Sequence, residues 1–211
     1  MLLIDFGLVW FAAYRWVGIL KIIPLKWERL ALAFLFALAV KSVILFFLVR
    51  LGVQPTASIQ LGLSALVLGL ALFFFPKPSG EEVIIPDQKT GLAWVTWFVV
   101  GVLFVFSIVN AWFFPITESD AVWYHIRGMS FLHEVRFDSD WVVPQLKQYP
   151  PFIPLLFAYL IAFDAEFLKI FFPLMYLLLN IIFYSRVLSL TGNKKMACLF
   201  TMVLATTPYF W

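Results

Sequence analysis

The sequence is poor in cysteine and in charge. Its 211 residues include one cysteine, Cys198, which stands inside an apolar run, so the chain forms no intrachain disulfide and its redox compartment is undetermined. Only 13% of the residues are Asp, Glu, Lys or Arg, which is about half the share that is usual in soluble domains. The net charge of +3 is small and scattered, which argues against a protein that binds nucleic acid.

The sequence is rich in apolar residues instead. They make up 64% of the chain, with 25 Phe and 9 Trp, and the mean hydropathy is +0.97. A soluble domain holds about 45–50% apolar residues, and a core of ordinary size has no room for so many aromatic rings. The composition therefore predicts an integral membrane protein in contact with a lipid bilayer.

The apolar residues form runs that are long enough to cross a bilayer, for which about 20 residues are needed. The first run has no basic residue before it and no small-residue cleavage site after it, so we interpret it as a retained span. The runs do not alternate as barrel strands do, and an open strand edge is not satisfied in lipid. The predicted fold is an all-α, polytopic transmembrane helix bundle. Its apolar runs lie at 2–20, 30–49, 57–75, 92–114 and 167–185, with a last run that reaches Trp211 after the polar turn 191–195.

One segment divides the chain. Residues 76–91 are rich in Pro, Gly and charge, which predicts a solvated linker. The linker separates an N-terminal extension of three spans, 1–75, from a second part, 92–211, that contains the long polar segment 115–150.

The positions of Lys and Arg predict an orientation. With the residues inside spans left out, the loops on the side of 76–91 hold five Lys or Arg and those on the side of 115–150 hold four. Because cytoplasmic loops carry the excess of positive charge, 115–150 is predicted to be extracytoplasmic. The run 150–163 is short for a span. If it is re-entrant or interfacial, the side of 76–91 holds eight Lys or Arg and the other side holds five. If it crosses the membrane, the numbers become six and seven. The rule therefore favours the re-entrant or interfacial alternative.

Most of the polar chemistry of the chain lies in 115–150. The segment has no HExxH, CxxC or Gly-rich phosphate loop and no pair of His or Cys at metal-ligand spacing, so no metal or other cofactor is indicated. Its charged and histidine residues are interleaved with aromatic residues: Glu118, Asp120, His125, Arg127, His133, Glu134, Arg136, Asp138, Asp140 and Lys147, with Trp123, Tyr124, Phe131 and Trp141.

Residues 120–135 are predicted to form an amphipathic, juxtamembrane helix that lies on the membrane surface. At 100° per residue, Asp120, Arg127 and Glu134 fall on one polar stripe, and Tyr124 flanks it. A second face collects mostly apolar positions, which we expect to turn toward lipid or the helix bundle: Val122, Ile126, Met129 and His133.

The same residues also fit purely structural roles. Thr117 and Asp120 fit a capping box at the start of a helix, the charged residues fit solvated ion pairs, and the aromatic residues fit an interfacial belt. Lys41 is more unusual because it stands inside a predicted span. Such a charge needs a partner in the bundle interior, or it must reach out to the membrane surface.

Three stretches follow one another in this part of the chain. Residues 117–125 read TESDAVWYH, 137–144 read FDSDWVVP, and 149–156 read YPPFIPLL. An acidic residue just after a span, a following aromatic residue, and W-x-V-P and P-P before the next helix resemble the first extracytoplasmic loop of the GT-C membrane glycosyltransferases. That group includes the protein O-mannosyltransferases and the lipid A aminoarabinose transferases, and the resemblance covers roughly 92–211.

The resemblance implies a reaction and a place. A sugar is transferred from a polyprenyl-phosphate donor to an acceptor of unknown identity, at the outer face of the plasma (inner) membrane. Asp120 matches the loop aspartate that acts as general base or orients the acceptor hydroxyl, a role that needs a positioned carboxylate. Ala121 stands where many relatives carry a second acid, which argues against a divalent metal held by an acidic pair.

Other residues of the segment are candidates for substrate binding. Arg127, Arg136 or Lys147 would neutralise the leaving lipid phosphate, since cations stabilise developing phosphate charge; no motif match supports this. The full set of candidate substrate-binding residues is Glu118, Tyr124, His125, Arg127, Arg136 and Lys147.

The chain ends before the further spans and the second acidic loop that these enzymes normally have. We therefore expect it to be an N-terminal portion that is inactive alone. Two alternatives stay open. One is a non-enzymatic membrane subunit or a relative that binds polyprenyl lipid, and the other is a transporter with Lys41 and Asp120 on its path.

Overall fold

The computed structural model describes residues 1–19, 25–75, 91–113, 119–138, 142, 150–165 and 167–207, and for 119–121 it describes the backbone alone. Within these ranges the regular structure is helical, without strands. Five of the helices there are long and apolar enough to cross a membrane. The predicted all-α fold with several membrane spans is confirmed at this level.

The long helices follow the predicted runs. They are α1 (Leu2–Ile19), α2 (Lys26–Arg50), α3 (Ala57–Phe74), α4 (Gly91–Phe113) and α8 (Phe171–Thr191), the last led by the 3-10 turn η1 (Leu168–Ile170). Two predicted bounds were wrong by several residues: α8 ends at Thr191, where the predicted run ends at 185, and α2 begins at Lys26, inside the basic loop expected over 21–29. Glu28 in this first turn is buried and forms an ion pair with Arg186 of α8, so the turn packs inside the protein.

Three shorter helices complete the described chain: α5 (Ser119–His133), α7 (Phe152–Ile161) and α9 (Lys194–Thr206). Only two residues separate α8 from α9. Gly192 ends α8 with a positive φ of 61°, a conformation that glycine adopts without steric cost. The side chain of Asn193 then accepts hydrogen bonds from the first amides of α9, as N-cap residues do.

The chain divides into two compact units. Unit 1 comprises Met1–Ala13, Phe36–Phe75 and Pro115–Leu168. Unit 2 comprises Tyr14–Leu35, Pro76–Phe114 and Lys169–Trp211. Helices α1 and α2 contribute one end to each unit.

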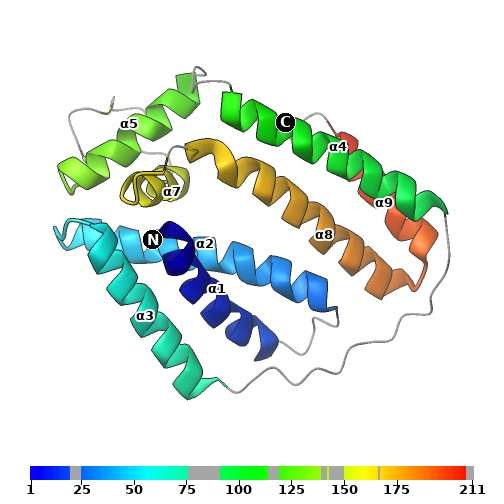
Figure 1. Ribbon diagram of the computed structural model, residues 1–211, viewed down its shortest axis with the longest axis horizontal. Coiled ribbons are helices and arrows are strands. Elements are labelled where there is room, and N and C mark those ends of the chain that lie inside the picture. Colours follow the sequence, from blue (N-terminus) through cyan, green and yellow to red (C-terminus); the bar gives the residue numbers. More distant parts are fainter. Residues whose placement is uncertain are drawn as a thin grey trace. The chain divides into compact units, whose positions relative to one another are not determined.

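Unit 1 contains α3, α5, α7, the N-terminal part of α1 and the C-terminal part of α2. Helix α7 is buried throughout from Pro154 to Leu160. Figure 1 looks almost straight down the axis of α7, whereas α2 and α3 lie across the view, so α7 runs crosswise to these two spans. The turn between α2 and α3 lies beside the end of α5, because Gln54 Nε2 donates a hydrogen bond to the Leu132 carbonyl at 3.3 Å.

The length of α7 bears on the short run 150–163. Its ten residues extend about 15 Å at 1.5 Å per residue, which is about half the thickness of the hydrocarbon core. A helix of this length does not cross a bilayer by itself. Its length and its crosswise direction both favour the re-entrant or interfacial alternative.

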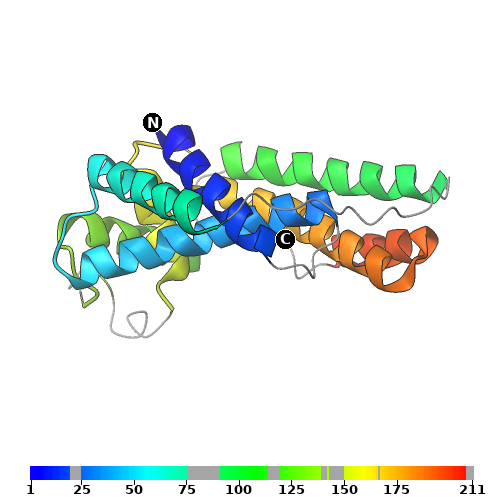
Figure 2. The same ribbon diagram turned by 90° about the horizontal axis from the view of Figure 1, so that it is seen from below.

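Unit 2 is built on α4, α8 and α9, and α4 and α8 run side by side in Figures 1 and 2. Its core is centred on Val100, Tyr176 and Ala205. On the other side of α4, large apolar side chains such as Phe98 and Phe106 are exposed. Exposed apolar side chains along a span are expected where lipid surrounds the helix.

Candidate functional site

The predicted site residues lie in and around α5. The predicted helix over 120–135 is confirmed, with bounds Ser119–His133. Asp120 stands in its first turn, and the structure describes the backbone of this residue without its side chain. Glu118 and Lys147 lie outside the described residues, as does the Thr117 of the expected capping box.

Tyr124 and His125 occupy the middle of α5 and are half-buried. The His125 ring meets the ring of Phe157 edge-on, with the centroids 6.3 Å apart. Burial lowers the pKa of His125 below its ordinary value, so the imidazole is neutral at pH 7. A neutral imidazole offers one donor and one acceptor, which suits binding to a hydroxyl group.

Arg127 is buried, contrary to its expected place on an exposed polar stripe. Only 4% of the residue is exposed, and its guanidinium carbon lies 5.7 Å from the centre of the Phe131 ring. Burial lowers the pKa of Arg127, yet an arginine stays charged because its ordinary pKa is so high.

The last residue of the predicted polar stripe, Glu134, lies beyond the end of the helix. Helix α5 stops at His133, and Val135 has a positive φ of 52°, which is strained for a β-branched residue. Glu134 therefore follows the helix, where its carboxylate pairs with Arg136 at 3.0 Å. The most buried positions of α5 are Arg127, Gly128, Ser130 and Phe131.

Gly128 accounts for which face of α5 is buried. A Cβ atom at this position would lie 2.9 Å from the Pro154 carbonyl oxygen, 3.0 Å from Phe157 Cβ and 3.1 Å from the Ala158 amide nitrogen. Two of these three atoms belong to the backbone of α7. Helices α5 and α7 therefore approach each other at a distance that only glycine allows.

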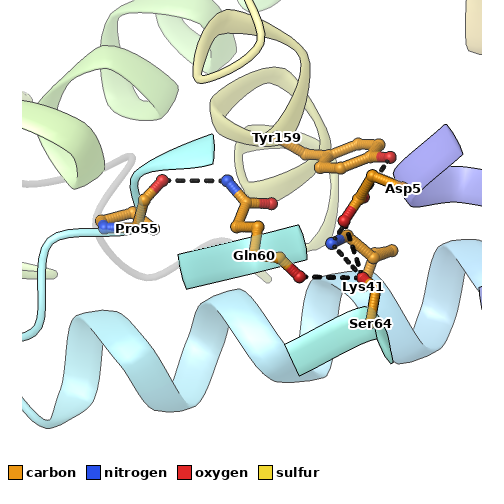
Figure 3. A network of polar contacts seen from close by, with 6 residues as sticks. All are labelled: Asp5, Lys41, Pro55, Gln60, Ser64 and Tyr159. Carbon is orange, nitrogen blue, oxygen red and sulfur yellow. Dashed lines mark hydrogen bonds and ion pairs between the residues drawn. The ribbon is translucent and has the colours of Figure 1, made fainter. Parts of the chain in front are cut away.

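A second polar site in unit 1 was not predicted as a whole. Lys41 Nζ lies 2.8 Å from Asp5 Oδ2, and both side chains are fully buried. The Tyr159 hydroxyl donates a hydrogen bond to Asp5 Oδ2 at 2.8 Å, and Ser64 Oγ lies 2.8 Å from Asp5 Oδ1. We call these four residues the Asp5 cluster; Figure 3 shows them converging from α1, α2, α3 and α7.

The polar groups of the Asp5 cluster satisfy one another. Lys41 also donates to Ser64 Oγ at 3.1 Å, and its ammonium group lies 4.6 Å from the centre of the Tyr159 ring, within the range of a cation–π contact. Ser64 has one proton for two acceptors, Asp5 and the Gln60 carbonyl at 2.9 Å, and the carboxylate is the stronger acceptor. The Asp5 cluster is thus neutral overall and joins four helices.

The depth of the Asp5 cluster follows from helix geometry. At 1.5 Å per residue, Lys41 lies about 14 Å along α2 from Arg50, and Ser64 about 10 Å along α3 from Ala57. Both distances start from the turn that joins α2 to α3. The ion pair therefore lies inside the apolar part of these helices, where an unpaired charge is expensive.

Gln60 borders the Asp5 cluster. Its side-chain nitrogen donates to the Pro55 carbonyl at 2.9 Å, and Figure 3 shows its side-chain oxygen on the side of Tyr159 and Asp5. This oxygen is buried and has no hydrogen-bond partner among the described residues. Such an acceptor is normally satisfied by an ordered water.

Sequence reasoning recognised one member of the Asp5 cluster. Lys41 was expected to need a partner in the bundle interior, and the structure identifies that partner as Asp5. The available signal was the presence of an acid in the first predicted span and a base in the second, because opposite charges inside a membrane pair with each other. Tyr159 had no comparable signal.

Unit 2 contains a buried ion pair of its own. Arg186 Nη2 of α8 lies 2.6 Å from Glu28 Oε1 of α2, and Glu28 is fully buried. No group of three or more His, Cys, Asp or Glu side chains in the described ranges is arranged to hold a metal ion.

Comparison with known proteins adds no relative: neither a family model, nor a curated protein, nor a solved structure matches this chain.

Proposed function

We propose that this chain is part of a membrane glycosyltransferase of the GT-C type, which transfers a sugar from a polyprenyl-phosphate donor to an acceptor at the outer face of the plasma membrane. The proposal rests on the order of features in 117–156. Asp120 stands in the first turn of a helix that follows span α4. That helix packs on the short apolar helix α7, which Pro150 and Pro151 precede.

Asp120 is the proposed catalytic residue. A carboxylate beside the anomeric carbon would remove the proton from the acceptor hydroxyl as the glycosidic bond forms. Tyr124 and the neutral imidazole of His125 follow on the same helix and are suited to bind sugar hydroxyls.

The burial of Arg127 changes the choice among the candidate phosphate-binding residues. A lipid phosphate needs a cation that it is able to reach, and Arg127 is buried beside Phe131. The side chain of Arg136 is 45% exposed and stands just after α5. Arg136 is therefore the better candidate among the described residues for neutralising the leaving phosphate.

The extracytoplasmic position of 115–150 is part of the proposal. With alternating spans, the turn between α2 and α3 and the segment after α4 lie on the same side of the membrane. The hydrogen bond from Gln54 to Leu132 supports this arrangement, and the Lys and Arg counts favour the outer side.

The contacts of Lys41 argue against a transporter. A residue on a transport path must exchange its partners with water or with the transported solute. Lys41 is fully buried and engaged with Asp5, Ser64 and the Tyr159 ring.

The test is a transfer assay with the full-length protein and labelled polyprenyl-phosphate sugars. Asp120→Asn should insert normally and lose about 10²–10⁴-fold in turnover, because asparagine keeps the shape and loses the proton acceptor. If Asp120 is only a helix cap, Asn replaces it well and turnover stays near that of the wild type.

Asp138→Asn is the matched control, since it removes an exposed carboxylate of the same segment that is not among the candidate site residues. It should lose little activity. A wild-type protein that binds polyprenyl phosphate and transfers no sugar would instead favour the lipid-binding subunit.

A further inference from the structure

The close packing of α5 on α7 fixes the part of α5 that follows Asp120. Gly128 brings the backbones of the two helices together. Near the other end of α5 the ring of Phe131 contacts that of Phe137, which in turn contacts Phe46 of α2. The position of Asp120 at the start of α5 therefore depends on where α7 lies.

Helix α7 is held in place without a contribution from the hydrophobic effect. It consists almost entirely of apolar residues, and in lipid an apolar surface gains no hydrophobic energy by packing against another helix. Van der Waals packing and polar bonds between helices are what remain. Among the hydrogen bonds that join described side chains of α7 to other helices is the one from Tyr159 to Asp5.

The other end of that bond, the Asp5 carboxylate, has two further partners. The Asp5 carboxylate receives the Lys41 ammonium from α2 and faces the Ser64 hydroxyl from α3. A phenol that donates to a carboxylate makes a short and strong hydrogen bond, and the surrounding low dielectric strengthens it further.

We propose that Tyr159, Asp5 and Lys41 are positioning residues for the site on α5: the Asp5 cluster fixes α7 against the first three spans, and α7 fixes α5 and with it Asp120. This inference rests on the proposed function for its catalytic consequence. The N-terminal spans then help to hold the site on α5 in position.

The test compares two tyrosine variants of the full-length protein. Tyr159→Phe removes the hydroxyl and keeps the ring that lies over Lys41. Tyr176→Phe is the matched control, because this buried hydroxyl also makes one bond between helices, to the Ala205 carbonyl at 3.2 Å, in unit 2. The first measurement is amide hydrogen exchange in peptides from α5 and α7, and the second is kcat and KM in the transfer assay.

For Tyr159→Phe we expect exchange in α5 and α7 to be about 3- to 20-fold faster, which corresponds to the strength of a hydrogen bond between membrane helices. Tyr176→Phe should leave α5 unchanged. Because a small displacement of a catalytic group is costly, kcat should fall about 10-fold for Tyr159→Phe with KM within about twofold.

Exchange in α5 that is the same in Tyr159→Phe as in the wild type would overturn the inference, and so would equal effects of both variants on α5. The exchange measurement does not depend on enzymatic activity. A wild-type protein without transfer activity would therefore refute the proposed function, while the exchange data alone decide whether the Asp5 cluster positions α5.

Discussion

The ion pair between Asp5 and Lys41 predicts an unusual pattern of stability effects. Lys41→Met removes the ammonium group and keeps a flexible side chain of similar length. The Asp5 carboxylate then stays fully buried with only the neutral donors Ser64 and Tyr159. Removal of one partner of a buried pair costs about 3–5 kcal/mol, and the two remaining donors place the expected loss at about 3 kcal/mol.

The double variant should be far less damaging than the sum of its parts. Asp5→Asn alone leaves the buried Lys41 without its counter-charge, at an expected cost of about 3 kcal/mol. Asp5→Asn combined with Lys41→Met removes both charges. The single Asn side-chain oxygen then accepts from either Ser64 or Tyr159, which bind different oxygens of the Asp5 carboxylate. We expect the double variant to lose about 3 kcal/mol in total, a coupling energy of about 3 kcal/mol.

The coupling is measured by unfolding the purified protein with SDS in detergent micelles and following the helix signal by circular dichroism. Lys26→Met is the control, because Lys26 is exposed and stands on the same helix; it should change stability by less than about 0.5 kcal/mol. If the two single effects add within about 0.5 kcal/mol in the double variant, the ion pair contributes nothing of its own and the reasoning fails.

Two further predictions concern packing and topology. Gly128→Ala should destabilise the protein by about 1–2 kcal/mol, because the clash with the α7 backbone costs more than the about 1 kcal/mol that alanine gains in a helix. The control, Gly101→Ala in α4, has open space around it and should be stabilising. Unfolding curves that move in the same direction for both variants would contradict the close approach of α5 and α7. Cysteines introduced by Ser139→Cys should react with an impermeant maleimide in intact cells and those introduced by Ser79→Cys should not; the reverse pattern would invert the topology.

The membrane spans were predictable because their signal is long and local. A run of about 20 apolar residues is rarely anything but a membrane span, and the predicted runs differ from the helices by only a few residues at most ends. The largest differences are at the end of α8, which is Thr191 where the predicted run ends at 185, and at the start of α2. Glu28 in the first turn of α2 pairs with Arg186, and no local pattern reveals a contact between residues so far apart in sequence.

The burial of Arg127 was not predicted, for a different reason. A helical wheel weighs side chains by polarity, so it placed Arg127 on the polar stripe and gave Gly128 no weight. Glycine is nevertheless the residue that allows α7 to approach most closely. Arginine is also able to lie against apolar neighbours, and here its guanidinium carbon lies over the Phe131 ring.

The division of the chain at 76–91 stays a prediction. It rests on composition, which detects where a chain is solvated and does not detect which helices share a core. Unit 1 contains residues from both sides of this segment, and the bond from Tyr159 to Asp5 connects them. Helix α7, from the second part of the chain, thus bonds to a residue near the N-terminus.

The charges on α2 show how a chain this apolar specifies the neighbours of its helices. Packing of one apolar surface on another in lipid distinguishes poorly between partners, whereas an unpaired buried charge excludes an arrangement outright. Helix α2 carries a buried acid, Glu28, in unit 2 and a buried base, Lys41, in unit 1, and each meets the opposite charge, Arg186 on α8 and Asp5 on α1. With the two charges reversed along α2, each pair would place like charges together. The order of these few charges along the sequence therefore restricts which helices are able to flank each end of α2, and through Tyr159 it extends that restriction to α7 and to α5.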